Sequence, residues 1–144
     1  MKKLLLVLLI FTCACSIKHS LTPENFQKKI EDKNFTVKDN TEISDAEFIK
    51  KELIALKKEY QIYYYESPTE DKAKELYEIN KSNILNNNKV TKNESNSKSF
   101  DKLEASNKKY IYYNIRIGNT SIYVEANIKY KKEIQKILKD IGYY

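Results

Sequence analysis

Few residues in this sequence have the types and spacing that enzymatic chemistry requires. The chain holds one histidine, His19, and two cysteines, Cys13 and Cys15, all close to the N-terminus. A serine–histidine–aspartate set and a cysteine–histidine pair both need an imidazole held in a folded site, and a metal site needs several such ligands. Two glycines in the whole chain are too few for a phosphate-binding loop. We therefore predict no catalytic site, no metal site and no cofactor.

The cysteines point to a different chemistry, because they follow a leader segment. Residues 1–3 are positively charged at two lysines, residues 4–11 form an unbroken apolar run, and small residues surround the two cysteines. This is the layout of a signal peptide. As a helix, eight residues span about 12 Å, whereas the hydrocarbon core of a bilayer is about 30 Å thick. The segment therefore predicts export and not a membrane-spanning anchor.

The end of the leader resembles a bacterial lipobox, in which small residues precede a cysteine that receives a diacylglycerol group before cleavage. Cys15 follows the favoured Ala14 but has Thr12 where the family prefers leucine, and Cys13 is the alternative site. The resemblance implies a signal peptide at residues 1–14, with acyl chains such as palmitate on Cys15, and a tether at residues 15–20.

That resemblance also implies a location. A lipidated cysteine would anchor the protein to the cell membrane or the outer membrane. The alternative is an ordinary secretory signal cut near Ala14, which would leave a secreted soluble protein.

The rest of the chain is rich in tyrosine, and the sequence holds 12 tyrosines and no tryptophan. A tyrosine offers an apolar ring face and a hydroxyl group, so an exposed set on one sheet face suits sugars, peptides or a protein partner. Alternatively, β-propensity alone places tyrosines on a solvated face, and Glu125 could simply satisfy the lone Arg116. The predicted partner-binding face consists of Tyr63, Tyr65, Tyr110, Tyr112, Arg116 and Tyr123.

The charge pattern argues against one class of partner. The net charge is +6, from 26 basic and 20 acidic residues, and every basic residue except Arg116 is a lysine. Specific phosphate and base recognition favours arginine, whose planar fork bonds bidentately, so we predict no nucleic-acid partner. Scattered lysines mildly favour anionic lipid headgroups, which agrees with a membrane partner.

Local patterns predict the elements that position these side chains in the first half of the chain. Thr22 and Pro23 start a helix over Pro23–Asp32, and Asn34–Lys38 alternates like a strand. Ser44 and Glu47 form a capping-box pattern that predicts another short helix. Residues 47–58 read either as helix throughout or as a helix followed by a strand. We choose the second, with Leu53–Leu56 paired to Tyr60–Glu66.

The second half carries clearer signals. Ser67, Pro68 and Glu70 start a helix over Pro68–Leu85, and residues 86–99 read as a polar loop. Gly118-Asn119 predicts a hairpin between Tyr110–Ile117 and Thr120–Ile128, and Lys131–Ile141 forms a closing helix before Gly142. The hairpin pairs are Ile117 with Thr120, Ile115 with Ile122, Tyr113 with Val124, and Ile111 with Ala126. The apolar face of the first of these helices consists of Ala73, Leu76, Tyr77, Asn80 and Ile84, with Asn80 its only polar member.

These elements predict an α+β fold. We expect an antiparallel sheet of two hairpins plus flanking strands, one of them over Phe100–Ala105, with helices packed mainly on one face. Residues 21–144 would form a single globular domain, with the polar loop at 86–99.

The segment Tyr110–Thr120, leading into a lysine-rich amphipathic helix, resembles small bacterial lipoproteins of unknown function. With the leader, it predicts a membrane-anchored lipoprotein of the cell envelope that is a non-enzymatic binding or accessory module for a protein or glycan partner. The alternative is a secreted or periplasmic hydrolase that acts on envelope glycan through paired carboxylates. Such an enzyme would need two acidic side chains that converge in a cleft.

Overall fold

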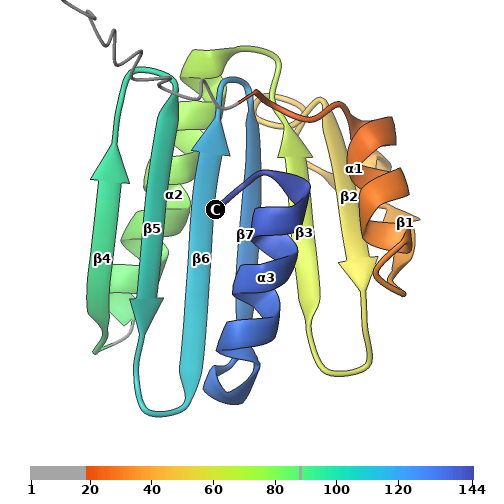
Figure 1. The fold of residues 1–144 in the computed structure, drawn as a ribbon. Helices are drawn as coiled ribbons and strands as arrows, with labels where there is room; N and C mark the ends of the chain where they lie inside the picture. Colours follow the sequence, from red (N-terminus) through yellow and green to blue (C-terminus); the bar gives the residue numbers. More distant parts are fainter. Residues whose placement is uncertain (1–18, 88) are drawn as a thin grey trace, which may run out of the picture.

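The computed structural model describes residues 19–87 and 89–144. They form a seven-stranded antiparallel sheet with three α-helices, so the predicted α+β class is confirmed (Figure 1). The predicted signal peptide, Cys13 and Cys15 lie outside the described residues.

Two antiparallel meanders meet at the centre of the sheet. The spatial order is β1-β2-β3-β7-β6-β5-β4, so β3 from the first meander pairs with β7 from the second. The first meander consists of β1 (Thr36–Asp39), β2 (Lys51–Leu56) and β3 (Gln61–Glu66). The second consists of β4 (Thr91–Asn96), β5 (Phe100–Ser106), β6 (Tyr110–Ile117) and β7 (Thr120–Asn127).

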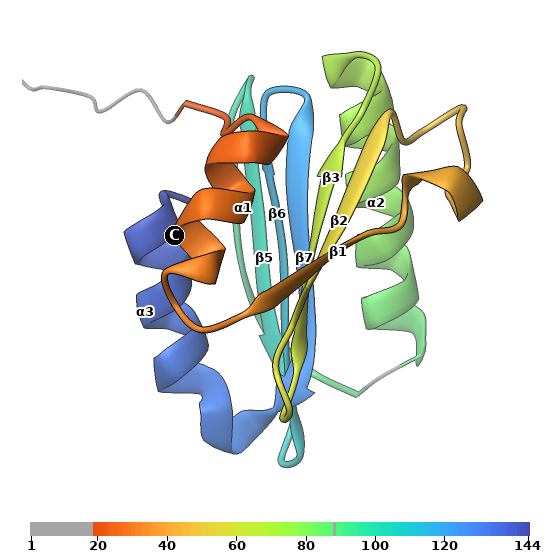
Figure 2. The ribbon, with the colours of Figure 1, turned by 90° about the vertical axis from the view of Figure 1, so that its right-hand side faces the viewer.

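Helices cover both faces of this sheet (Figure 2). Two of the three, α1 (Pro23–Glu31) and α3 (Lys131–Ile141), share one face, as predicted. The long helix α2 (Glu70–Asn87) crosses the opposite face and connects β3 to the far edge strand β4. Two short 3-10 helices, η1 (Thr41–Ile43) and η2 (Ile128–Tyr130), complete the elements.

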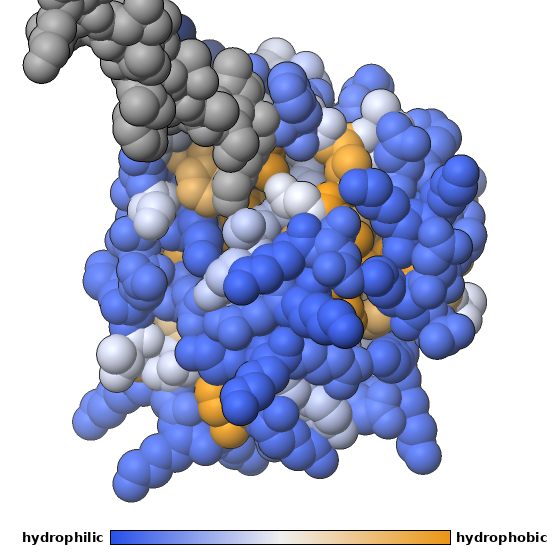
Figure 3. All heavy atoms as spheres, viewed as in Figure 1, coloured by the Kyte–Doolittle hydropathy of each residue, from blue (hydrophilic) through white to orange (hydrophobic). Residues whose placement is uncertain are grey.

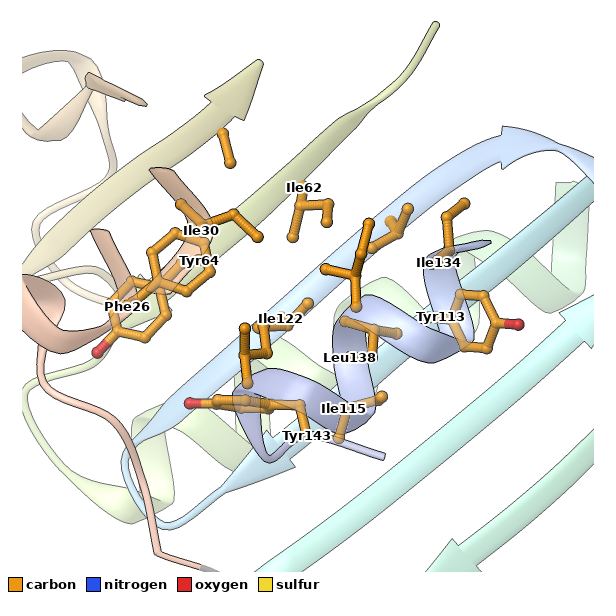
Figure 4. Packing of buried hydrophobic residues seen from close by; sticks show 14 of the residues in the cluster. Phe26, Ile30, Ile62, Tyr64, Tyr113, Ile115, Ile122, Ile134, Leu138 and Tyr143 are labelled. Carbon is orange, nitrogen blue, oxygen red and sulfur yellow. The ribbon is translucent and has the colours of Figure 1, made fainter. Parts of the chain in front are cut away.

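The main core lies between the sheet and the pair α1 and α3 (Figure 4). Phe26 of α1 stacks on Tyr64 of β3 with 4.7 Å between ring centroids, and Leu138 of α3 is fully buried. Burying each such side chain contributes roughly 1.5–3 kcal/mol. The outer surface of this side is mostly hydrophilic, with hydrophobic residues visible only in small patches (Figure 3).

A second, smaller core lies beneath α2. Tyr77 and Ile84 of the helix pack with Leu103, Ala105 and Tyr112 of the sheet. The predicted apolar face of this helix therefore does cover a sheet. The helix begins later than predicted, because Thr69 and not Ser67 caps it: the Lys72 amide donates to Thr69 Oγ1 at 3.2 Å.

The strongest local signals are confirmed. All four predicted pairs of the β6–β7 hairpin are present, and Gly118 in its turn has a φ of 57°. The β2–β3 hairpin, β5, α1 and α3 also form where predicted, and Gly142 has the left-handed conformation expected after α3.

Two of the predicted segments have a different structure. The polar loop at 86–99 contains β4, an edge strand of six polar residues that pairs with β5. The short helix after Ser44 is a turn that follows η1. The Glu47 amide there donates to Asp45 Oδ1, and Ser44 Oγ donates to the Glu52 carboxylate, so these side chains stabilise a turn instead of a helix start.

Candidate binding groove

A groove of about 740 Å³ lies beside α2 on the face of the sheet that this helix covers only in part. It is bounded by α2 on one side, by β3 and β7 below, and by the β2–β3 turn at one end. We call it the tyrosine groove. Its lining includes Gln61, Tyr63, Tyr65, Asn80, Tyr123 and Glu125.

The pairing of β3 with β7 places the tyrosines together. Tyr63 lies opposite Tyr123 in the register, and Tyr65 shares their face because side chains alternate along a strand. The Tyr63 ring is 6.3 Å from the Tyr65 ring and nearly parallel to it, and it meets the Tyr123 ring edge to face at 6.2 Å. All three rings are half-buried, so they present fixed apolar surface to the groove.

Polar groups lie beside these rings. The Tyr63 hydroxyl donates to Gln61 Oε1 at 2.8 Å, and the Tyr123 hydroxyl donates to Glu125 Oε2 at 3.5 Å. Burial raises the pKa of Tyr65 and of Tyr123, so both hydroxyls stay protonated at neutral pH and can donate hydrogen bonds. Asn80 adds an amide from the helix side of the groove.

Four of the six predicted partner-binding residues line this groove, namely Tyr63, Tyr65, Tyr110 and Tyr123. Tyr112 does not, because it is 3% exposed beneath α2. The placement of Tyr112 on an accessible face is therefore wrong.

Arg116 is also buried, because only 1% of its surface is exposed. Its Nε donates to Asp101 Oδ2 at 2.6 Å, and its other nitrogens donate to the carbonyls of Gly118 and Lys98. The prediction that Glu125 pairs with Arg116 is wrong. The partner of Arg116 is Asp101, which lies directly opposite it on β5. Arg116 therefore links β5, β6 and the adjoining turn residues inside the fold.

Sequence reasoning missed the part that the helix contributes. Asn80 was recognisable as the single polar residue on the apolar face of α2, and the structure places it at the groove. A single amide side chain on an otherwise apolar helix face can therefore indicate a polar site beside the core.

Two carboxylates, Glu59 and Glu125, line the groove, and both side chains are exposed. Within the described residues, no group of three histidine, cysteine or acidic side chains is placed to hold a metal ion. None of the helices in that part of the chain combines the length and the apolar character that crossing a membrane requires.

No protein-family model matches this sequence, and no curated protein is detectably similar to it. Among solved structures, the fold is similar to that of a GTP-binding regulator from Thermotoga maritima. The TM-score is 0.53, the sequence identity is 14%, and the match covers 85% of each chain. At this identity the similarity concerns the fold alone.

Proposed function

We propose that this protein is a lipid-anchored protein of the cell envelope that binds a glycan in the tyrosine groove and has no enzymatic activity. The observation that supports the proposal is the set of three half-buried rings, Tyr63, Tyr65 and Tyr123, beside the amides of Gln61 and Asn80. Tyrosine rings pack against the apolar C–H faces of sugars, and amide and hydroxyl groups bond sugar hydroxyls.

The size of the groove favours a glycan over a folded protein. Small-ligand sites have volumes of about 300–1,000 Å³, and the groove falls within this range. A stable protein interface buries about 800 Å² on each partner and centres on a well-packed apolar patch. The concave, mixed lining of the tyrosine groove suits a narrow chain better.

The position of the groove agrees with an anchor at the N-terminus. Residues 19–22 lie at the end of the sheet that carries the β6–β7 turn: a Cβ on Gly118 would be 3.9 Å from Ser20 Oγ. The Tyr64 hydroxyl donates to the Leu21 carbonyl at 2.6 Å and holds this segment in place. The groove reaches the β2–β3 turn at the opposite end (Figure 1), so a ligand there would be directed away from the anchor.

Nothing in this sequence supports GTP binding like that of the structurally similar regulator. The two glycines here lie in a hairpin turn and after a helix, and neither belongs to a phosphate-binding loop.

The test is calorimetric titration with a neutral glycan, chitohexaose, for which we expect measurable binding. A Tyr63→Ala and Tyr123→Ala double variant should bind at least tenfold more weakly, because two of the three rings that would contact the sugar are lost. Tyr144→Ala is the matched control, since Tyr144 packs on the opposite face against Tyr113. Equal affinity of the double variant, or the absence of binding by the unchanged protein, would refute the glycan site.

A hydrolase is the second candidate, because Glu59 and Glu125 both line the groove. Glycosidases keep one acid protonated by burial, whereas both of these side chains are exposed, so binding without cleavage is the better-supported function. Prolonged incubation with envelope glycan should release no new reducing ends. Release that disappears in Glu125→Gln would establish the enzyme instead.

A further inference from the structure

Lysines gather at the end of the sheet where the β2–β3 turn borders the groove. They come from three segments, the β2–β3 turn, the β5–β6 turn and η2, which lie at the same end of the molecule (Figure 1). The Ile128 amide donates to the Lys109 carbonyl at 2.9 Å and holds the β5–β6 turn against η2. We call this surface the lysine end; its members are Lys57, Lys58, Lys108, Lys109 and Lys129.

Most of these lysines lack an acidic partner. Lys57 pairs with Glu133, with 2.6 Å between Nζ and Oε1. Among the described residues, no carboxylate lies within ion-pair distance of the other four. Lys109 Nζ lies 5.1 Å from the centre of the Tyr110 ring, which lines the groove, and Lys129 Nζ lies 4.9 Å from the Tyr130 ring. Aromatic contacts orient a charge without cancelling it.

The opposite end of the sheet carries several acidic residues. Glu66 ends β3 and pairs with Lys50, and Glu70 and Asp71 begin α2 beside it. Glu42, in η1, lies close to this end as well. Like charges gathered beside a groove raise the local concentration of oppositely charged ligands. The five lysines outnumber the nearby acidic residues Glu59, Glu125 and Glu133, so the lysine end would attract an anion to the groove.

We propose that the ligand of the tyrosine groove is an anionic glycan, a saccharide chain that carries carboxylate groups. This inference rests on the proposed glycan-binding function and adds the charge of the ligand. Sugar rings pack on the tyrosines while carboxylates farther along the chain meet Lys58, Lys109 and Lys129. Lysine is a flexible point charge and tolerates variable spacing along such a chain.

Separate lysines on three segments favour carboxylates over phosphates. Lysine can bind phosphate as a point charge, but specific phosphate sites favour bidentate arginines or the amides of a helix N-terminus. The only arginine is buried with Asp101, and α2 begins at the other end of the sheet. The separate lysines of the lysine end therefore suit single carboxylates that are spaced along a polymer.

The experiment compares two hexasaccharides of the same length, the neutral chitohexaose and the carboxylated hyaluronan hexasaccharide. At low salt we expect hyaluronan to bind at least tenfold more tightly, and at 0.5 M salt we expect about equal affinities because exposed charges are then screened. The triple variant Lys58→Gln, Lys109→Gln, Lys129→Gln should lose the preference but still bind chitohexaose. A control of the same net charge, Lys28→Gln, Lys29→Gln, Lys136→Gln, alters exposed residues on α1 and α3 and should keep the preference.

The outcomes separate the two proposals. Equal binding of both sugars at low salt would overturn the anionic ligand and leave the glycan site intact. Binding of neither sugar would overturn both. If poly-glutamate binds as tightly as hyaluronan, and the Tyr63→Ala and Tyr123→Ala variant keeps that affinity, the lysine end attracts acids in general and the inference fails.

Discussion

Asp101 on β5 and Arg116 on β6 form an ion pair beneath α2, with 2.6 Å between Oδ2 and Nε. Their side chains are 6% and 1% exposed, and the two residues lie directly opposite each other in the register. The two carbonyls that Arg116 also contacts precede β5 and follow β6, and they lie at the same end of this antiparallel pair, so the contacts fix that end of the meander.

Asp101→Ala should lower the free energy of unfolding by about 3–5 kcal/mol, because it leaves the Arg116 charge buried without a partner. Urea denaturation measures this loss. Asp140→Ala is the control, since it breaks the Lys33–Asp140 pair, whose side chains are 36% and 37% exposed. That loss should stay below about 1 kcal/mol. Similar losses for the two variants would contradict the role of burial.

Alkali should destabilise the protein between about pH 10 and pH 12. Burial raises the pKa of Tyr143 and of Tyr144 to about 12, and it raises the pKa of seven other tyrosines. The fold therefore favours the neutral phenols. Their contribution to stability is complete below the unfolded value near 10 and is lost as the pH rises through the folded values.

Urea unfolding at pH 9, 10 and 11, together with tyrosinate absorbance, measures this effect. Tyr144→Phe should weaken the pH dependence, because it removes one of the raised groups and its bond to Glu104 at 2.8 Å. Unfolding free energies that stay constant across this pH range would show that ionisation of the tyrosines does not destabilise the fold.

Gly118→Ala should destabilise the β6–β7 hairpin by about 1–2 kcal/mol. The φ of Gly118 is 57°, which an L-residue with a Cβ adopts only with strain. The added Cβ would meet its nearest neighbour, Glu70 Oε1, at an ordinary 3.7 Å, so conformation and not crowding sets the cost. Thermal unfolding measures it, and an unchanged melting temperature would argue against the strain.

Lipid attachment predicts a specific N-terminus. Mass spectrometry of the native protein should find an acylated Cys15 as its first residue, and Cys15→Ser should release the protein from the membrane fraction. Acylation at Cys13 would move the cleavage site by two residues. An unmodified terminus would leave a secreted protein and remove the anchor from the proposed function.

The elements that could be predicted are those whose own residues define them. Gly118-Asn119 fixes a two-residue turn, and the alternation on either side then sets the β6–β7 register with no outside information. The spacing of Ile134, Ile137, Leu138 and Ile141 likewise determines α3 and its buried side.

The errors concern relationships between elements. Strand β4 has no apolar alternation, because an edge strand needs only the backbone bonds of one neighbour and polar side chains there discourage unwanted pairing. Tyr112 and Arg116 were expected to be accessible because no local pattern says which face of the sheet α2 will cross. The tyrosine groove itself depends on the pairing of β3 with β7, which joins residues sixty positions apart, such as Tyr63 and Tyr123.

The pairing of β3 with β7 also sets the order in which the sheet can be completed. During translation, one side of β3 lacks its partner strand until β7 is made, and α3, which seals the main core, follows β7. Every nascent chain that ends before β7 lacks the strand that joins the two meanders. The complete sheet can therefore form only after most of the chain has been translated, which would suit the export that the proposed function requires.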